Sequence, residues 1–443
     1  MAAPAYAAST ATSLSFPQDE YTATACEPVV SGVQVLATSS DGTPESGVAI
    51  TVTLSAGIQF ADGTSVYVGT TDEDGLITLP DIEATSSGTT ATIAATTSDG
   101  SSVSATITIE SVTSTIFFQP ASGSETEYPA LPDGVTVAAL QQTNINSIRR
   151  TYVLGSDGVL YRSVSGGAWS TLASSVTDIA VPADGAGGIA YAVDDTDVYF
   201  QAVSGSADEY PALTSGVTVA DLQQTYFNSN LRTYVLGSDG ILYRSVEGAA
   251  WTQLASNVTD IAVPADGGGG VAYAVDDTDV YFQPVSGSAT DYPALPDGVT
   301  VAVLQQTNVN STVRTYVLGS DGVLYRSVSG GAWSTLASSV TDIAVPADGA
   351  GGIAYAVDDT DVYFQPVSGS ATDYPALPDG VTVAVLQQTN INSTVRTYVL
   401  GSDGVLYRSI AGAAWVALAS SVTHIAVVAA SGGGISYATI PSC

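Results

Sequence analysis

The sequence contains no lysine and a single histidine, and its nine basic residues are all arginines. These face 43 acidic residues, which gives a formal net charge of −34. Because nucleic acids and anionic membranes are themselves negatively charged, this balance argues against a partner of either kind. Only 12% of the residues are charged and 45% are hydrophobic, so the composition predicts a folded chain rather than a disordered one.

Cysteine and long apolar runs are also scarce. The only cysteines are Cys26 and Cys443, so the chain is not a disulfide-rich scaffold, but a single bridge between them is expected in an oxidising compartment. No run approaches the roughly 18–20 apolar residues of a membrane span. The start of the chain lacks the basic and apolar regions of a signal peptide. Two alternatives remain: a trimmed secretory signal, or the native start of a virion protein released by lysis.

What the chain has instead is a long repeat. Tryptophan recurs every 82 residues, at Trp169, Trp251, Trp333 and Trp415. Four whole periods fit between residue 115 and residue 443. Each period is itself doubled, and each half holds four short strand patterns, which is the size of one propeller blade. The sequence therefore predicts an all-β domain at 111–443, an eight-bladed β-propeller built from four double-blade repeats.

The ends of the repeat predict how the propeller closes. The first period lacks its opening strand, and residues 435–438 supply the same pattern where the sequence ends. We expect both ends to share one blade, which removes two open sheet edges. Exchange of this strand between chains is the alternative, and it would produce a homo-oligomer.

Residues 12–110 follow a different pattern, after an Ala/Ser/Thr-rich arm at 1–11. Short alternating Val/Ile/Thr runs are separated by Asp-Gly pairs, as in an antiparallel β-sandwich. The stretches Gly47–Leu54, Phe60–Ser65 and Thr71–Pro80 resemble bacterial Ig-like domains of the invasin type. That resemblance implies an anchoring or spacing module rather than an enzyme.

A second resemblance lies in the repeat. Leu154-Gly-Ser-Asp-Gly-Val-Leu-Tyr-Arg162, followed by Ala168-Trp169, resembles tectonin-type repeats and, less closely, those of the regulator-of-chromosome-condensation type. The histidine and Trp-Gly elements of the second family are absent. Both families are propellers whose members are mostly binding proteins, so this resemblance implies the fold and no site residues.

Eight of the nine arginines occupy two repeated positions: Arg150, Arg232, Arg314 and Arg396, and Arg162, Arg244, Arg326 and Arg408. A ring of guanidinium groups is suited to hold a carboxylate or phosphate on the propeller axis. The alternative is pairing of each arginine with a nearby aspartate of its own blade, which repetition alone would reproduce in every period.

The second period differs from the others after its Gln-Gln-Thr motif. It reads Tyr226-Phe227-Asn228 where the other periods have Asn-Ile-Asn or Asn-Val-Asn. We interpret Tyr226 and Phe227 as exposed loop aromatics on one sector, suited to stacking on sugars or anchoring a protein contact. Sequence drift is the competing interpretation.

Other polar patterns give weaker signals. His424 stands where the other periods have aspartate and has no partner in the pattern, so we interpret it as a drifted surface position. The Asp-Asp-Thr-Asp runs, such as Asp194–Asp197, lack the spacing of known calcium loops and suit hairpin turns. We predict no metal and no cofactor.

These features predict a non-enzymatic, extracellular binding protein. Its Ig-like part anchors or spaces a propeller that recognises a glycan or a surface protein. The alternative is a structural or decoration protein on a capsid or tail lattice. A polysaccharide-active enzyme is a weaker third hypothesis, because near-identical periods disfavour the asymmetric carboxylate pair that glycoside hydrolysis needs.

Overall fold

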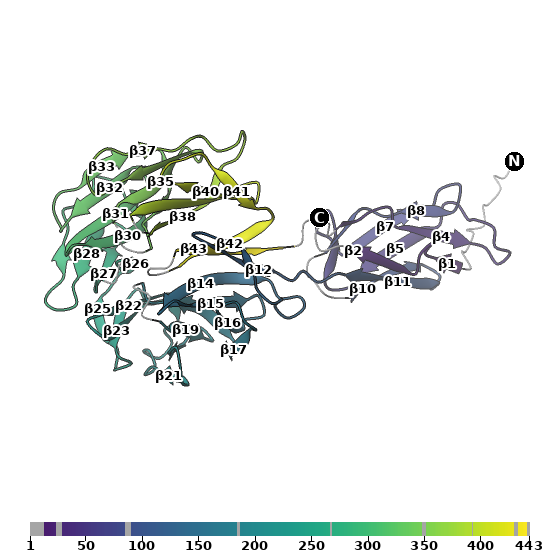
Figure 1. The fold of residues 1–443 in the computed structure, drawn as a ribbon. Coiled ribbons are helices and arrows are strands. Elements are labelled where there is room, and N and C mark those ends of the chain that lie inside the picture. Colours follow the sequence, from purple (N-terminus) through teal and green to yellow (C-terminus); the bar gives the residue numbers. More distant parts are fainter. Residues whose placement is uncertain are drawn as a thin grey trace. The chain divides into compact units, whose positions relative to one another are not determined.

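The computed structural model describes residues 13–23, 29–84, 90–183, 187–265, 268–347, 351–391, 393–428 and 433–440 (Figure 1). Every secondary-structure element within these residues is a β-strand, so the all-β prediction is confirmed. None of the described residues forms a helix long and apolar enough to cross a membrane. The chain divides into two compact units, one reaching from the N-terminus to Thr113 and including Pro132–Gly134, the other holding Ser114–Leu131 and Val135–Ile440.

The first unit contains three sheets. In spatial order their strands are β1 (Ser13–Ser15), β4 (Gln34–Thr38) and β8 (Leu76–Thr78); β2 (Glu20–Ala23), β11 (Ser102–Ile109), β10 (Thr90–Thr97), β5 (Ala49–Leu54) and β7 (Val66–Thr70); and β3 (Val29–Val30), β9 (Ile82–Ala84) and β6 (Ile58–Phe60). Side chains of all three sheets meet in one apolar core.

Alternation along β5 shows why this sequence forms strands. Ile50, Val52 and Leu54 are buried in the core, whereas the threonines between them point away from it. The Asp-Gly pairs form the predicted turns. Gly63 has a φ of +81°, a conformation that glycine adopts without steric cost, and the Asp62 carboxylate accepts a hydrogen bond from the Thr64 N–H at 3.0 Å.

The described strands of the second unit form eight four-stranded antiparallel sheets, which repeat in chain order. Seven consecutive sheets are β14 (Val137–Ile145), β15 (Ile148–Gly155), β16 (Leu160–Val164), β17 (Ser170–Ala173); β18 (Val176–Ala180), β19 (Ile189–Val193), β20 (Asp197–Gln201), β21 (Ala207–Glu209); β22 (Val219–Phe227), β23 (Asn230–Gly237), β24 (Leu242–Val246), β25 (Thr252–Ala255); β26 (Val258–Ala262), β27 (Val271–Val275), β28 (Asp279–Gln283), β29 (Thr290–Asp291); β30 (Val301–Val309), β31 (Thr312–Gly319), β32 (Leu324–Val328), β33 (Ser334–Ala337); β34 (Val340–Ala344), β35 (Ile353–Val357), β36 (Asp361–Gln365), β37 (Thr372–Asp373); and β38 (Val383–Ile391), β39 (Thr394–Gly401), β40 (Leu406–Ile410), β41 (Val416–Ala419).

The remaining sheet joins the two ends of the repeat. It consists of β13 (Thr126–Glu127), β12 (Thr115–Pro120), β43 (Gly434–Thr439) and β42 (Val422–Val427), in that order. β12 and β43 pair antiparallel, and the rings of Phe117 and Tyr437 stack across this pair with centroids 5.4 Å apart. The prediction that both ends share one sheet is confirmed. Exchange of this strand between chains stays a prediction.

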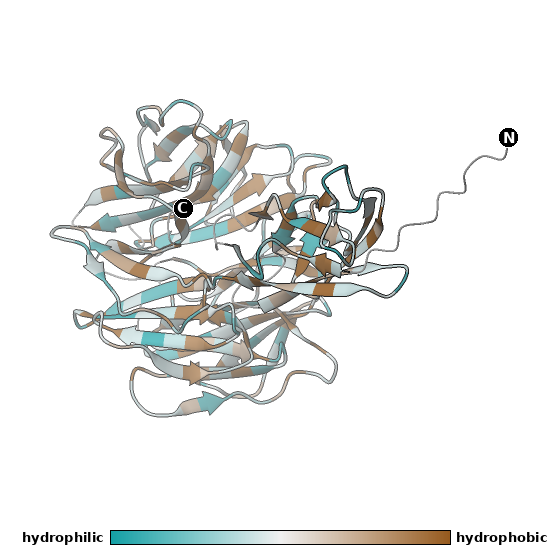
Figure 2. Cartoon of the chain, turned by 90° about the vertical axis from the view of Figure 1, so that its right-hand side faces the viewer, coloured by the Kyte–Doolittle hydropathy of each residue, from teal (hydrophilic) through white to brown (hydrophobic). Residues whose placement is uncertain are grey.

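The sheets follow one another around a ring. The first strand of each sheet touches the next sheet, and β42 of the closing sheet touches β14, so the series returns to its beginning. Apolar clusters fill the space between neighbouring sheets, which is why strands such as β15 are buried on both faces. Hydrophobic segments recur in many of the strands in Figure 2. This repeated, closed arrangement of four-stranded sheets is that of a β-propeller.

Each tryptophan fastens a short outer segment to its sheet. Trp333 stacks on Tyr292 with ring centroids 5.5 Å apart, and its indole N–H donates to the Pro293 carbonyl at 2.6 Å. The same pair of contacts recurs at the other three tryptophans. The 82-residue spacing of tryptophan therefore reflects a repeated packing contact.

Candidate functional site

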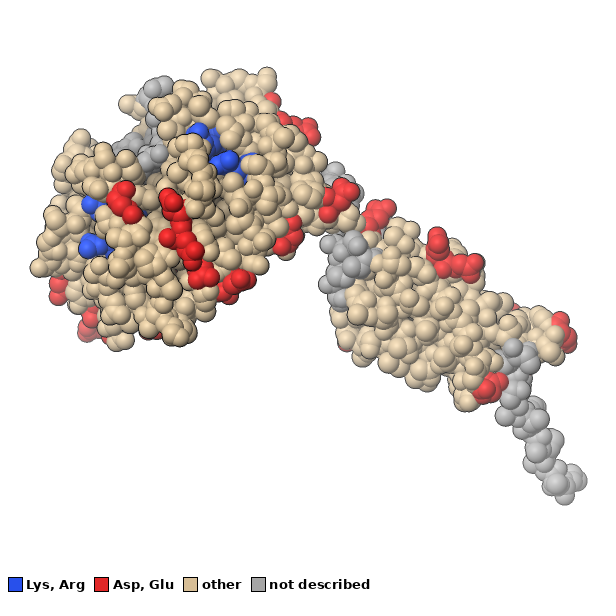
Figure 3. Space-filling view, turned by 90° about the horizontal axis from the view of Figure 1, so that it is seen from below, with Lys and Arg blue, Asp and Glu red and all other residues tan. Residues whose placement is uncertain are grey.

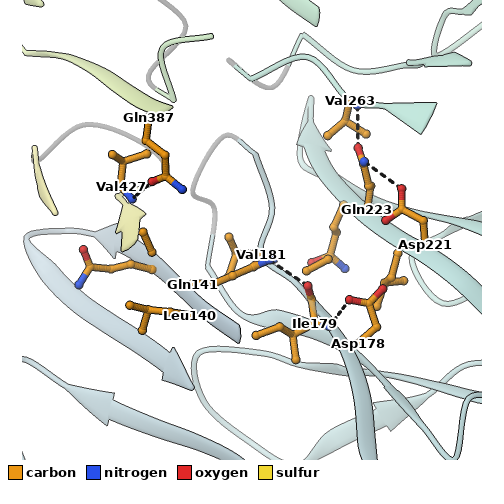
Figure 4. Close-up of a pocket in the computed structure, with 15 residues that line it drawn as sticks. Leu140, Gln141, Asp178, Ile179, Val181, Asp221, Gln223, Val263, Gln387 and Val427 are labelled. Atoms are coloured by element: carbon orange, nitrogen blue, oxygen red, sulfur yellow. Dashed lines mark hydrogen bonds between the residues drawn. The ribbon is translucent and has the colours of Figure 1, made fainter. Parts of the chain in front are cut away.

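Two polar cavities, of about 420 and 360 Å³, lie at the centre of the ring, and Figure 4 shows the first of them. Together they are lined by residues from the first strand of every sheet. Eight glutamines, two from each period, line these cavities, and one of each two bonds through its amide to the backbone of the neighbouring sheet: Gln141, Gln223, Gln305 and Gln387.

Each of these glutamines joins two neighbouring sheets. Gln141 on β14 donates from Nε2 to the Ile179 carbonyl at 2.9 Å and accepts from the Val181 N–H at 2.7 Å through Oε1. The other three make the same two bonds one period further on. Because the nitrogen and the oxygen of each amide bond to the neighbouring sheet, these side chains tie the ring together.

Aspartates form the hydrogen bonds between those neighbouring sheets that the glutamines do not connect. Asp260 on β26 accepts the N–H of Ile261 at 2.8 Å through Oδ1 and that of Leu304, on the next sheet, at 2.9 Å through Oδ2. Asp342 bonds Ile343 and Leu386 in the same way. Carboxylate and glutamine thus link sheets alternately around the ring.

His424 takes the place of this aspartate in the closing sheet. It lies half-buried on β42, where it pairs with Ala438 of β43 and hydrogen-bonds to the backbone of Ala138 on β14, so our interpretation of it as a surface position is wrong. Burial lowers the pKa of the imidazole, and hydrogen bonding to the backbone of Ala138 acts against that shift. The closing joint therefore differs chemically from the other three.

Asp221 breaks the symmetry of the central cavities. The corresponding residues are Ala139, Val303 and Val385, so one period does carry an asymmetric carboxylate, contrary to the premise used against an enzyme. A column-by-column comparison of the periods would have found it. Asp221 and Asp178 line the same cavity, and Gln223 donates to Asp221 at 3.1 Å.

Burial dominates the electrostatics of this group. It raises the pKa of Asp221, and it raises the pKa values of Asp178 and Asp260 to about 6, with the charge of Asp221 adding to both shifts. Asp178 and Asp260 still accept backbone N–H groups through short bonds. The described residues contain no group of three or more side chains suited to hold a metal ion.

A third cavity, of about 310 Å³, lies between the second and third of the seven consecutive sheets. We call it the Tyr226 pocket. Its aromatic walls are Phe200, Tyr210 and Tyr226, Leu231 forms part of its lining, and its carboxylates are Asp208, Glu209 and Glu247. Its volume is at the lower end of the range for small-ligand sites, and its mixed lining is typical of them.

Five of the fifteen residues that are found only in the second period line this pocket. Tyr226, Leu231, Glu247 and Asp208 replace Asn144, Arg149, Ser165 and Thr126 of the first period, and Ala202 replaces Pro120. Relative to the first period, these exchanges add two negative charges and remove one positive charge. The other ten second-period exchanges lie elsewhere, among them Asp221 at a central cavity, but these five meet at one cavity and change its charge.

Tyr226 and Phe227, which we expected to act together, contact different parts of the structure. Tyr226 and Phe227 end strand β22 and are half-buried, so the interpretation of both as exposed loop residues is wrong. Adjacent strand residues point to opposite faces. Tyr226 lines the pocket, while Phe227 lies against Gly269 of the next sheet, as Ile145 does against Gly187. Asn228 is exposed in the turn that follows, with a φ of +50°.

The arginine predictions do not match the observed contacts. No arginine lines either central cavity, so a guanidinium ring on the axis is not formed by the described residues. Arg150, Arg232, Arg314 and Arg396 instead donate to backbone carbonyls of their own hairpins, Arg232 to those of Phe227 and Asn230. For these four arginines the observed partners are carbonyls rather than aspartates, and the pairing of Arg162, Arg244, Arg326 and Arg408 stays a prediction.

The turn interpretation of the Asp-Asp-Thr-Asp runs agrees with the structure. Asp194 and Asp195 have φ values of +48° and +59° in the tight connection between β19 and β20. Cys26 and Cys443 lie outside the described residues, so their bridge stays a prediction. Acidic side chains are spread over the face seen in Figure 3, where basic ones occur at few places.

Comparison with known proteins adds similarities of low identity. No protein-family model and no curated protein matches the sequence. Among solved structures, dihydro-heme d1 dehydrogenase NirN is 10% identical over 66% of this chain and 70% of its own, with a TM-score of 0.47. BamB from Moraxella catarrhalis is 13% identical over 69% and 99%, with a TM-score of 0.45. AztD from Citrobacter koseri is 7% identical over 75% and 99%, with a TM-score of 0.45.

Proposed function

We propose that this chain is a non-enzymatic binding protein displayed outside the cell, and that the Tyr226 pocket is its recognition site. The observation that carries the proposal is that five residues found only in the second period, two of them carboxylates and one a tyrosine, line a single cavity. Repetition preserves the scaffold, and a single altered sector supplies a distinct site. Its partner is a glycan or a surface protein.

The proposal assigns each part of the chain a role. Each four-stranded sheet is one blade, which makes residues 111–443 an eight-bladed propeller. Residues 12–110 form an Ig-like sandwich that anchors or spaces it, and residues 1–11 form an arm. The shared core of the first unit supports the sandwich assignment.

The central cavities support a structural role better than catalysis. One glutamine of each period, together with Asp260 and Asp342, bonds to backbone groups of the neighbouring sheet, so these side chains maintain the ring. The carboxylates around Asp221 are the one observation that keeps a polysaccharide-active enzyme under consideration.

The test is binding of the labelled full chain to intact cells and to virus-like particles from the source, with a Tyr226→Asn variant as the comparison. Asparagine is the residue that the other periods carry at this position. Loss of cell or glycan binding in the variant supports recognition through the pocket. Equal binding of both proteins to a particle lattice supports the decoration alternative, and release of sugar from a polysaccharide would revive the enzyme.

A further inference from the structure

The first period shows what fills the position of the Tyr226 pocket in a neighbouring sector. There the Arg149 guanidinium carbon lies 3.7 Å from the centroid of the Phe118 ring, and Arg149 Nε donates to the Tyr128 hydroxyl at 2.9 Å. A Cβ atom added at Gly166 would lie 3.7 Å from Arg149 Nη2. One arginine side chain therefore contacts an aromatic face, a tyrosine hydroxyl and a glycine.

The same three contact residues line the Tyr226 pocket. Phe118, Tyr128 and Gly166 correspond, one period later, to Phe200, Tyr210 and Gly248. Arg149 corresponds to Leu231, which is shorter and uncharged. The second sector thus retains the surroundings of a guanidinium group while lacking the group itself.

The charges of the second sector fit an external cation better than those of the first. Glu247 and Asp208 take the places of Ser165 and Thr126. Burial raises the pKa of Tyr210 to about 12, and both carboxylates contribute to that shift, so their field reaches the aromatic wall. Glu247 also accepts a hydrogen bond from the Leu231 N–H, which holds it beside the cavity.

We propose that the Tyr226 pocket binds an alkylguanidinium group, the side chain of an arginine on a partner polypeptide. This rests on the proposed function and names its partner class. Phe200 and Tyr226 provide aromatic faces for the planar cation, and Glu247 and Asp208 provide the opposite charge. A guanidinium suits this site better than an ammonium, because it is planar, stacks on aromatic rings and is more weakly hydrated.

The test uses three small probes and the full chain. N-acetyl-L-arginine methylamide is compared with its citrulline counterpart, which has the same shape without the charge, and with its lysine counterpart. Binding is followed by ligand-observed NMR, since one side chain gives only weak affinity. We expect saturable binding of the arginine probe, with affinity for the citrulline and lysine probes weaker by about tenfold or more.

Two variants locate the site. Leu231→Arg should place a guanidinium in the pocket within the same chain, abolish probe binding and raise the thermal midpoint. Val395→Arg is the matched control, because the corresponding fourth-period position lacks both added carboxylates, and it should leave binding unchanged. If Leu231→Arg does not fold, Glu247→Gln supplies the same test through an affinity loss of several-fold.

The outcomes separate this inference from the proposed function. Equal binding of the arginine and citrulline probes, or no binding of any probe to the folded protein, overturns the guanidinium assignment. Binding unaffected by both Leu231→Arg and Glu247→Gln overturns it too. If cells or glycans are still bound in a manner that depends on Tyr226, the proposed function stands without it.

Discussion

Replacing Asp221 with valine should stabilise the propeller unit at neutral pH. Val303 and Val385 occupy the corresponding position in two other periods, so the backbone accepts this side chain. The substitution removes a buried carboxylate whose charge helps to raise the pKa values of Asp178 and Asp260. It also removes one hydrogen bond from Gln223, whose Nε2 keeps its bond to the Ile261 carbonyl at 2.9 Å.

The magnitude follows from the pKa shifts. A shift of one unit corresponds to about 1.4 kcal/mol, so a rise from 3.8 to about 6 represents about 3 kcal/mol for each of Asp178 and Asp260. Burial is the largest cause, and the substitution recovers only the smaller part due to Asp221. The substitution also removes the cost of burying the Asp221 carboxylate itself. After about 1 kcal/mol is subtracted for the lost hydrogen bond, we expect the free energy of unfolding to rise by about 1–2 kcal/mol.

The sign of the pH dependence is fixed by the direction of the shifts. Because the folded pKa values are raised, the folded state holds more protons than the unfolded state between about pH 4 and 6. These groups favour folding below that window, and that advantage is lost as the pH rises through it. The gain from Asp221→Val should therefore be full at pH 7.5 and smaller at pH 5.

Urea unfolding followed by tryptophan fluorescence measures this effect, since all four tryptophans lie in the propeller unit. We choose pH 5 as the lower limit because the isoelectric point is near 4.1. Ala139→Val places the same side chain at the first-period position, where no charge is removed, and serves as control. Destabilisation by Asp221→Val at pH 7.5, or an equal gain at both pH values, would refute the electrostatic reasoning.

Three further predictions concern the scaffold. Trp333→Phe keeps the ring stack on Tyr292 but removes the hydrogen bond to the Pro293 carbonyl, so it should lower the free energy of unfolding in urea by about 1 kcal/mol. Trp333→Ala removes both contacts and should lower it by about 2–3 kcal/mol, whereas equal losses in the two variants would count against a contribution from the stack. Ile435→Ala removes a fully buried side chain from the closing sheet and should lower the free energy of unfolding by about 2–5 kcal/mol. Backbone amide hydrogen exchange should become faster in β12 and β43 before it does elsewhere, and a uniform increase over all strands would contradict closure by these two strands. In oxidising conditions, intact mass spectrometry should show a mass lower by two hydrogen atoms for a Cys26–Cys443 bridge, and two alkylatable thiols would disprove it.

The strands and their order could be predicted from the sequence because they depend on local patterns of residues. Alternating apolar residues predicted the strands, and the offset between the first and last repeats predicted that β12 and β43 would share a sheet. Side-chain direction was not readable in this way. Tyr226 and Phe227 are neighbours in sequence, yet they face different sheets, because the polar Gln-Gln-Thr segment before them continues as strand β22 rather than forming a loop.

The candidate site was only partly predictable for a related reason. Tyr226 stood out as an exchange in one period, but the cavity beside it combines β20, β21, β22, β23 and the turn after β24, which meet only when sheets pack. Arg149 and Leu231 occupy matching positions, and the meaning of that exchange depends on the Phe118 contact. The contacts of the arginines at the position of Arg232 were predicted wrongly because their guanidinium groups bond to backbone carbonyls, whose positions cannot be inferred from the pattern of charged residues.

The central claim is that the second sector, and no other, carries the recognition site. The direct measurement is the binding of the full chain to its source cells after Tyr226→Asn, Leu231→Val and Glu247→Ala are combined, which gives this sector the residues of the fourth period. The account predicts that the variant folds with an unchanged or higher urea midpoint and loses binding. A folded variant that binds as well as the original chain would contradict it.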